Sequence, residues 1–355
     1  MRLPFSRSNS IVGLDIGSSS VKAMEVVVKP KGMELLHMGI APLPSEAIVQ
    51  GAFLNSGAIV EAIREAIDTA GIKSKQVATA ISGHAVIVKK ISLPQMSEEE
   101  LEESIRWEAE QYIPFDINEV NLDFQIVRHG DAEEQMEVLL VAAKKDLIDD
   151  YTQVISDAGL TPVILDVAAF AVENAYDYAF EPGAGETAAL VNIGSQVVNI
   201  NIVCDGVPVF TRDMTTGGQA YTEEIQKALS IGFDEAEQIK IGGAAGTESQ
   251  EVVPQEVEQA MRGVTDNLIG EITRSLDFYS ATSAESEINR IILSGGGCRV
   301  SGLDAAFQGK TNIPVERLNP LARMISSSKW NPDELDEVAP SLGVCVGLAM
   351  RRANV

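Results

Sequence analysis

One short pattern occurs twice in this chain, and it constrains the fold more than any other feature of the sequence. Residues 11–25 read I-V-G-L-D-I-G-S-S-S-V-K-A-M-E, and residues 189–203 read A-L-V-N-I-G-S-Q-V-V-N-I-N-I-V. When Asp15 is aligned with Asn192, an apolar strand, a turn containing Gly-Ser and a second apolar strand coincide in both copies. Such an internal repeat is far more specific than either copy alone, so it predicts a fold with two similar halves.

The turn in the first copy consists of residue types that let a backbone approach an anion. Gly17 has no Cβ, and the three residues after it, Ser18, Ser19 and Ser20, place hydroxyls beside free N–H groups. Asp15 ends the buried strand, where a carboxylate would meet a phosphate-bound metal ion. Two such hairpins facing each other would hold a polyphosphate from both sides of a cleft.

The segments around the hairpins predict an α/β fold with a small inserted α+β unit. A helix at residues 57–70 and a strand at 77–81 complete the first layer. An acidic helix at 98–112, begun by the capping box of Ser97 and Glu100, and a second helix at 144–158 lie among strands of the inserted unit. We expect four subdomains: residues 1–85 with 166–184 and 339–355, the inserted unit 86–165, residues 185–230 with 286–338, and a helical unit 231–285 that closes the cleft. A last helix is expected at residues 338–352.

Composition excludes several classes of function. The chain has 27 Lys and Arg against 52 Asp and Glu, and this balance argues against binding to nucleic acid or to an anionic membrane surface. The three cysteines have no C-x-x-C pairing and the three histidines are scattered, so no zinc site is indicated. We find no apolar segment of the ~18 residues typical of a transmembrane helix, and no signal peptide, so we expect an intracellular protein. The basic residues 1–10 either contact a membrane or form a simple terminus.

Three further stretches carry candidate site residues. Gly217 and Gly218 precede a helix, and Gly295, Gly296 and Gly297 follow a buried strand at residues 288–293. The three consecutive glycines 295–297 predict a close approach of the backbone to a flat or anionic group. Glu237 and Lys240 lie three residues apart on one face of a short charged helix. They form either a solvated ion pair or a pair that contacts a ribose.

Together, these motifs resemble the nucleotide-binding set of the superfamily of actin, sugar-kinase and heat-shock-protein ATPases, and the inserted unit is similar to that of FtsA-like proteins. The stretch 105–115, I-R-W-E-A-E-Q-Y-I-P-F, resembles the W-E-A-E-x-Y-I-P-F signature of the PilM family of type IV pilus assembly proteins. The resemblance extends over nearly the whole chain. It implies a two-lobed actin-like (ribonuclease H-like) α/β fold with a duplicated core.

The resemblance also implies a cleft that holds ATP with Mg²⁺, with Asp15 as the metal ligand. The residues that it assigns to the nucleotide are Asp15, Gly17, Ser18, Ser19, Ser20, Lys22, Gly194, Ser195, Gln196, Gly217, Gly218, Glu237, Lys240, Gly295, Gly296 and Gly297. Lys22 either reaches a phosphate or points away from it. Asp166 matches the position where superfamily members place an acid or Gln that orders the attacking water, so it is the candidate catalytic residue.

The second loop departs from the superfamily pattern. Active ATPases usually carry Asp and then Thr where this chain has Asn192 and Val197. An amide in place of a carboxylate weakens metal binding and water polarisation, but it removes repulsion against a triphosphate. We therefore expect a chain that binds ATP and hydrolyses it slowly or not at all.

The resemblance implies a partner as well. Members of the family capture the cytoplasmic N-terminal tail of the inner-membrane protein PilN in a groove between the first and the inserted subdomains. We expect a cytoplasmic protein that reaches the inner membrane only through partners, contacts other type IV pilus components, forms a homo-oligomeric ring and binds no nucleic acid. The acidic helix belongs either to the partner surface or to a solvated face. Two other functions stay open: an active ATPase or phosphotransferase, opposed by Asn192, and an FtsA-like division protein, opposed by the W-E-A-E-Q-Y-I-P-F stretch.

Overall fold

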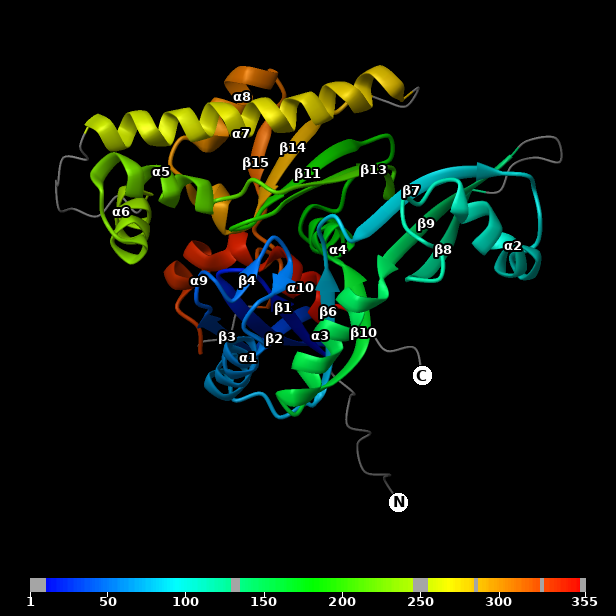
Figure 1. Ribbon diagram of the computed structural model, residues 1–355, viewed down its shortest axis with the longest axis horizontal. Coiled ribbons are helices and arrows are strands. Elements are labelled where there is room, and N and C mark those ends of the chain that lie inside the picture. The colour runs from blue at the N-terminus through cyan, green and yellow to red at the C-terminus, as the bar shows by residue number, and fades with distance from the viewer. Residues whose placement is uncertain (1–10, 129–134, 245–254, 284–286, 326–328, 352–355) are drawn as a thin grey trace.

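Two five-stranded sheets form the two halves of the computed structural model, which describes residues 11–128, 135–244, 255–283, 287–325 and 329–351 (Figure 1). The first sheet has the order β3-β2-β1-β6-β10 and the second the order β13-β12-β11-β14-β15. The strands of the first are β1 (Val12–Ile16), β2 (Ser20–Lys29), β3 (Gly32–Pro42), β6 (Gln76–Ile81) and β10 (Thr161–Val167). Those of the second are β11 (Thr187–Ile193), β12 (Val198–Cys204), β13 (Val207–Met214), β14 (Arg290–Ser294) and β15 (Val315–Arg317). The predicted duplicated α/β fold is confirmed.

The two sheets agree down to the register of their hairpins. Asp15 lies opposite Lys22 in the first hairpin, and Asn192 lies opposite Asn199 in the second. In each half, the first hairpin strand also pairs in parallel with a strand that arrives later in the chain, β6 in one case and β14 in the other. The sequence repeat is therefore a structural repeat, with the two turns at matching positions.

Helices separate and cover the sheets. On the first sheet, α1 (Ser56–Ala70) and α3 (Lys145–Asp157) share a core with the strands, and a short hairpin of β4 (Ile48–Val49) and β5 (Ala52–Phe53) lies before α1. Between the sheets, α4 (Ala168–Phe180) and α10 (Gly343–Ala349) pack with apolar residues of both halves. The second sheet is covered by α7 (Gln255–Thr282) and α8 (Leu303–Thr311). Among the described residues, no helix is both long enough and apolar enough to span a membrane.

The inserted unit is smaller than the sequence predicts. Its sheet, in the order β7-β9-β8, consists of β7 (Val86–Leu93), β8 (Val120–Arg128) and β9 (Met136–Lys144), covered by α2 (Glu98–Glu110). The expectation that it continues to residue 165 is wrong, because β10 pairs in parallel with β6 of the first sheet and Tyr151, Val154 and Ile155 of α3 belong to the first core. The sequence pattern predicts the strands and helices of this region, but it does not reveal which sheet a strand joins.

Two other boundaries also differ from expectation. The helix expected at residues 338–352 is found as the 3₁₀ turn η2 (Ala339–Leu342) followed by α10, since Pro340 has no N–H for a helical hydrogen bond. A separate short helix, α9 (Pro332–Val338), precedes them. The expected helical unit 231–285 does not stand apart from the second sheet, because Leu268 and Ile272 of α7 lie in that sheet's core. The first half of α7 also packs with α5 (Gln219–Leu229) and α6 (Phe233–Ala244), through Val257 and Met261. A second 3₁₀ turn, η1 (Gly296–Arg299), follows β14.

A buried carboxyl between the halves should make stability depend on pH. Glu173 on α4 accepts a hydrogen bond from Asn201 Nδ2 at 2.8 Å, and burial raises the pKa of Glu173 to about 8. Because the folded pKa lies above the unfolded value of 4.5, the folded chain holds an extra proton between these two values. The contribution of Glu173 to the free energy of unfolding should therefore be highest below the unfolded pKa. This contribution should fall by roughly 1 kcal/mol per pH unit as the pH rises from the unfolded pKa toward the folded pKa.

The variant Glu173→Gln tests this, since a glutamine oxygen still accepts from Asn201 but carries no charge. Urea unfolding of the variant and the wild type should give similar free energies near pH 5 and a clear advantage for the variant near pH 8. An advantage of the same size at both pH values would contradict the prediction.

Candidate functional site

Both hairpin turns are closed by the same backbone hydrogen bond. Gly17 N donates to Ser20 O at 3.1 Å, and Gly194 N donates to Val197 O at 2.9 Å. A Cβ on Gly194 would lie 2.8 Å from Val197 O, so the second turn in this form requires glycine. Two tight turns of matched geometry thus end the first strands of the two halves.

Asp15 and Lys22 form an ion pair at the first turn. They lie opposite each other on β1 and β2, and Lys22 Nζ is 3.1 Å from Asp15 Oδ2, with both side chains largely buried. The ammonium group also lies beside the turn, 3.8 Å from where a Cβ of Gly17 would be. Lys22 therefore does not point away from the loop. It neutralises the carboxylate that was expected to hold a metal ion.

Asn192 is part of a hydrogen-bonded ladder that crosses between the halves. Asn192 Nδ2 donates to Asn199 Oδ1 at 2.9 Å, and Asn199 Nδ2 donates to Asp213 Oδ1 at 2.8 Å. The backbone N–H of Gly83, in the loop between β6 and β7, donates to the other carboxylate oxygen at 2.5 Å. Burial raises the pKa of Asp213, opposed by these two donors. The amide at position 192 thus has a structural task, because a carboxylate there has no hydrogen to donate.

The glycine-rich segments lie together, although most of their glycines serve contacts within the protein. Gly218 N donates to Gly194 O at 2.8 Å, which joins the start of α5 to the second turn. A Cβ on Gly217 would lie 2.5 Å from Ser195 O, and Cβ atoms on Gly295 and Gly297 would lie 2.3 Å from Ile193 O and 2.5 Å from Ile193 Cγ2. The backbone at these three positions therefore approaches the chain itself. Gly296 differs, because it is exposed with open space around its Cα.

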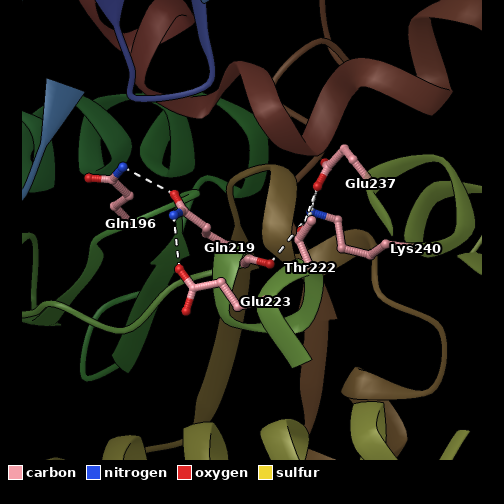
Figure 2. Close-up of polar contacts among 7 residues, drawn as sticks. Gln196, Gln219, Thr222, Glu223, Glu237 and Lys240 are labelled. Atoms are coloured by element: carbon pink, nitrogen blue, oxygen red, sulfur yellow. Dashed lines mark hydrogen bonds and ion pairs between the residues drawn. The ribbon is translucent and has the colours of Figure 1, made fainter. Parts of the chain in front are cut away.

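Glu237 and Lys240 form a partly buried cluster with Thr222 rather than a solvated pair (Figure 2). Lys240 Nζ is 2.7 Å from Glu237 Oε2 and 3.0 Å from Thr222 Oγ1, and the threonine hydroxyl donates to the same carboxylate at 2.5 Å. Lys240 Nζ also lies 3.5 Å from Gly218 O. The cluster thus connects α6 to the glycine turn at the start of α5.

Gln196 connects the second turn to the first half of the chain. Its Nε2 donates to Ile48 O at 2.9 Å, and Gln50 N donates to its Oε1 at 2.9 Å. The same Nε2 lies 3.1 Å from Gln219 Oε1, as Figure 2 shows. The side chain was expected to face a ligand, and in this conformation its amide is used between the halves.

Asp166 lies at the junction of β10 and α4, where both of its carboxylate oxygens have partners. Oδ2 accepts from Arg351 Nε at 2.6 Å, and Oδ1 accepts from the backbone N–H of Val167 at 2.8 Å. The side chain is buried. These contacts give Asp166 a structural task, and its catalytic role stays a prediction.

The sequence reasoning missed Asn199, Asp213, Thr222 and Gln219. Asn199 had a usable signal, because a polar residue in an apolar strand opposite Asn192 follows from the hairpin register itself. Thr222 also had one, since it lies one helical turn after Gly218. Asp213 had the same kind of signal, because the register of β12 and β13 places it opposite Asn199, but only the tertiary fold brings it to Gly83.

Comparison with known proteins identifies the family. The family model of the type IV pilus assembly protein PilM matches residues 13–353. A solved PilM–PilN type IV pilus biogenesis complex contains a chain that is 30% identical, with a TM-score of 0.85 over 96% of this chain and 98% of that one. Cell division protein FtsA of Escherichia coli strain K12 is 23% identical over 88% of this chain and 84% of its own length. MreB5 of Spiroplasma citri bound to ADP shares the fold. It is 14% identical, with a TM-score of 0.52 over 95% of this chain and 94% of that one. The chain belongs to the PilM family of type IV pilus assembly proteins.

Proposed function

We propose that this chain is an ATP-binding scaffold of the type IV pilus assembly complex that docks the cytoplasmic N-terminal tail of PilN. The nucleotide part rests on one observation above all. Two turns with the same closing hydrogen bond lie at matching positions in the two halves, with the glycine segments 217–218 and 295–297 beside the second. Backbone N–H groups of such turns bind phosphate oxygens.

The residues present suit a triphosphate with Mg²⁺. Mg²⁺ in proteins is held by one or two carboxylates together with phosphate oxygens and water. Asp15 would supply the single carboxylate, and the described residues contain no group of three or more His, Cys, Asp or Glu that would hold a metal unaided. Lys22 and the hydroxyls of Ser18, Ser19 and Ser20 would contact phosphate oxygens. Gly194 and Ser195 would do so from the other half, with Gln196 released for the same purpose.

The remaining residues would hold the nucleoside. Glu237 and Lys240 have the acceptor and donor groups that a ribose and an adenine require, and the exposed backbone at Gly296 would lie against the base. Mg²⁺ would offset the charge of the triphosphate. The chain's own part would be to orient the phosphates between the two turns.

Slow hydrolysis or none follows from the same geometry. The amide of Asn192 is oriented by Asn199 and brings no charge toward a metal ion or an attacking water. Asp166 is neutralised by Arg351. Both features favour a scaffold over the alternative of an active ATPase or phosphotransferase.

The partner part of the proposal rests on family membership and charge. The 30% identical chain was solved in a complex described as PilM–PilN. Cytoplasmic segments next to a membrane helix carry an excess of Lys and Arg, and a chain of net charge −25 would attract them. Through that tail, the chain would be held at the inner membrane among the other pilus components. We also propose that copies of the chain assemble there into a ring.

One calorimetric experiment tests both parts. ATP with Mg²⁺ is titrated into the wild type and Asp15→Ala, followed by a synthetic peptide of the PilN tail from the same organism. We expect ATP binding that is at least tenfold weaker in Asp15→Ala, peptide binding in both proteins, and little phosphate released. Equal ATP affinity in the two proteins would contradict the site. Rapid phosphate release would favour the enzyme, and an absence of heat with the peptide would refute the docking proposal.

A further inference from the structure

One segment of the first half reaches both hairpin turns. Residues 43–55, which we call the strap, connect β3 to α1 and contain the short β4–β5 hairpin. At the start of the strap, Leu43 N donates to Ser19 O of the first turn at 2.9 Å. Further along, the hairpin of the strap contacts the side chain of Gln196 in the second turn. The strap is therefore hydrogen-bonded to both places where we propose that phosphates bind.

The strap belongs to the first half by its own packing. Leu54 N donates to Ala47 O at 2.9 Å, which closes the base of the hairpin. The side chain of Ile48 is buried in the core of the first sheet. The ring of Phe53 packs on Tyr151 of α3, with 4.7 Å between the ring centroids. The contact of this hairpin with the second turn is therefore a contact between the two halves.

The side-chain amide of Gln196 is fully occupied by this contact. Gln50 N donates to Gln196 Oε1 at 2.9 Å, and Gln196 Nε2 donates to Ile48 O at 2.9 Å. We call these two hydrogen bonds to the strap backbone the clasp. Nε2 also donates to Gln219 Oε1 at 3.1 Å (Figure 2). Since an amide NH₂ group has two hydrogens, none is left for a further acceptor.

The orientation of the Gln196 amide follows from its partners. Figure 2 shows that Gln219 lies between Gln196 and Glu223, and Gln219 Nε2 donates to Glu223 Oε1 at 2.9 Å. An ionised carboxylate only accepts, so Gln219 presents its oxygen to Gln196, which must answer with its NH₂ group. The strap requires the same orientation, because it offers one N–H and one carbonyl oxygen. The clasp is thus specific for an amide.

We propose that the Gln196 clasp opens when a triphosphate binds at the second turn, so that the strap hairpin is freed from the second half. Phosphate oxygens accept hydrogen bonds, and the Gln196 side chain can donate to one only after it leaves the strap or Gln219. The inference rests on the proposed nucleotide site and describes how that site is regulated. Linkage is reciprocal, so a clasp that opens on binding also weakens the binding of ATP.

Hydrogen exchange of one backbone amide reports the clasp directly. Gln50 is exposed and its N–H donates to Gln196, so the protection of this N–H depends on the clasp. NMR of protein that carries isotope-labelled glutamine should show roughly tenfold slower exchange at Gln50 in the wild type than in Gln196→Ala. Saturating ATP with Mg²⁺ should raise the wild-type rate to that of the variant. The amide of Gln308, in α8, is the internal control and should not change.

Strain in the hairpin turn should change ATP affinity while Gln196 stays intact. Gln50 and Gly51 form a two-residue turn with φ values of 51° and 85°, which asparagine and glycine adopt most easily. A hairpin this short is marginal by itself, so strain in its turn acts against the clasped state. Gly51→Ala should therefore bind ATP roughly threefold more tightly than the wild type, and Gln50→Asn should bind ATP more weakly.

The turn between β12 and β13 offers a matched control. Asp205 and Gly206 have φ values of 51° and 73°, and nothing lies within 4 Å of an added Cβ at Gly206, as at Gly51. Gly206→Ala thus introduces the same kind of strain outside the strap, and it should bind ATP as the wild type does.

Calorimetric titration of ATP with Mg²⁺ into the same proteins separates the possible failures. A wild type that does not bind ATP would refute the proposed nucleotide site, and the opening of the clasp with it. A wild type that binds ATP while the Gln50 amide stays protected would refute the opening of the clasp alone. Equal ATP affinity of Gly51→Ala and Gly206→Ala, or equally slow Gln50 exchange in Gln196→Ala and the wild type, would do the same.

Discussion

Replacing Gly347 with alanine should lower the free energy of unfolding by about 3 kcal/mol or more. Gly347 lies in α10 where this helix crosses α4, and an added Cβ would be 1.8 Å from Ala171 O and 2.5 Å from its carbonyl carbon. Both atoms belong to the backbone of a helix buried between the two sheets, so no side-chain rotation relieves the overlap. The helices would have to separate, and both sheets pack on them. Thermal and urea unfolding of the purified variant measure the effect.

A matched control is available in α7. Gly270 is also a helical glycine, but nothing lies within 4 Å of its added Cβ. Gly270→Ala should therefore stabilise the protein, by up to ~1 kcal/mol, since alanine has the higher helix propensity. If both variants shifted stability in the same direction, crowding between α10 and α4 would not be the cause.

Replacing Asn192 with aspartate should destabilise the chain by about 1–3 kcal/mol, the cost of leaving buried acceptors without a donor. Asn199 lies between positions 192 and 213, and its amide has one side that donates and one that accepts. With carboxylates at both 192 and 213, the Asn199 NH₂ group can donate to only one of them, and the other faces an oxygen. Urea unfolding of Asn192→Asp against the wild type gives the size of the loss.

The double variant Asn192→Asp with Asp213→Asn isolates the cause. With the Asn199 amide reversed, Asp at 192 accepts from it, Asn at 213 donates to it, and the oxygen of that asparagine still accepts from Gly83 N. The whole ladder is then satisfied in the opposite direction, and most of the lost stability should return. Additive losses in the double variant would show that the ladder does not couple these positions.

The sequence alone was sufficient to predict the features that repeat within the chain. The two hairpins, their turns and the paired register follow from patterns that are local in the chain, and the structure has Asp15 and Asn192 at matching positions. The capping box of α2 was predictable for the same reason, since Ser97 and Glu100 contact each other within one turn. Local chemistry determines all of these.

The features that were missed depend on which elements meet in space. The pattern of β10 identifies a strand, but its pairing with β6 decides that it leaves the inserted unit. The glycines 217, 295 and 297 were expected to lie beside a nucleotide, but the atoms that an added Cβ would meet there belong to Ser195 and Ile193 of the chain itself. The last hydrogen bond of the ladder, from Gly83 N to Asp213, joins residues 130 positions apart, which no local pattern encodes.

The inserted unit enters and leaves the first half at a single point. Val86 and Ala143, its two ends, are paired neighbours on adjacent strands, and Ala85 O accepts a hydrogen bond from Lys144 N. Paired strands lie about 5 Å apart, so the remaining chain would need only a tight turn to close if the unit were absent. Evolution can therefore replace or modify the inserted unit as a whole while the duplicated core stays unchanged. Variation among relatives should accordingly concentrate in the exposed faces of the inserted unit, where new partners are gained and lost without cost to the duplicated core.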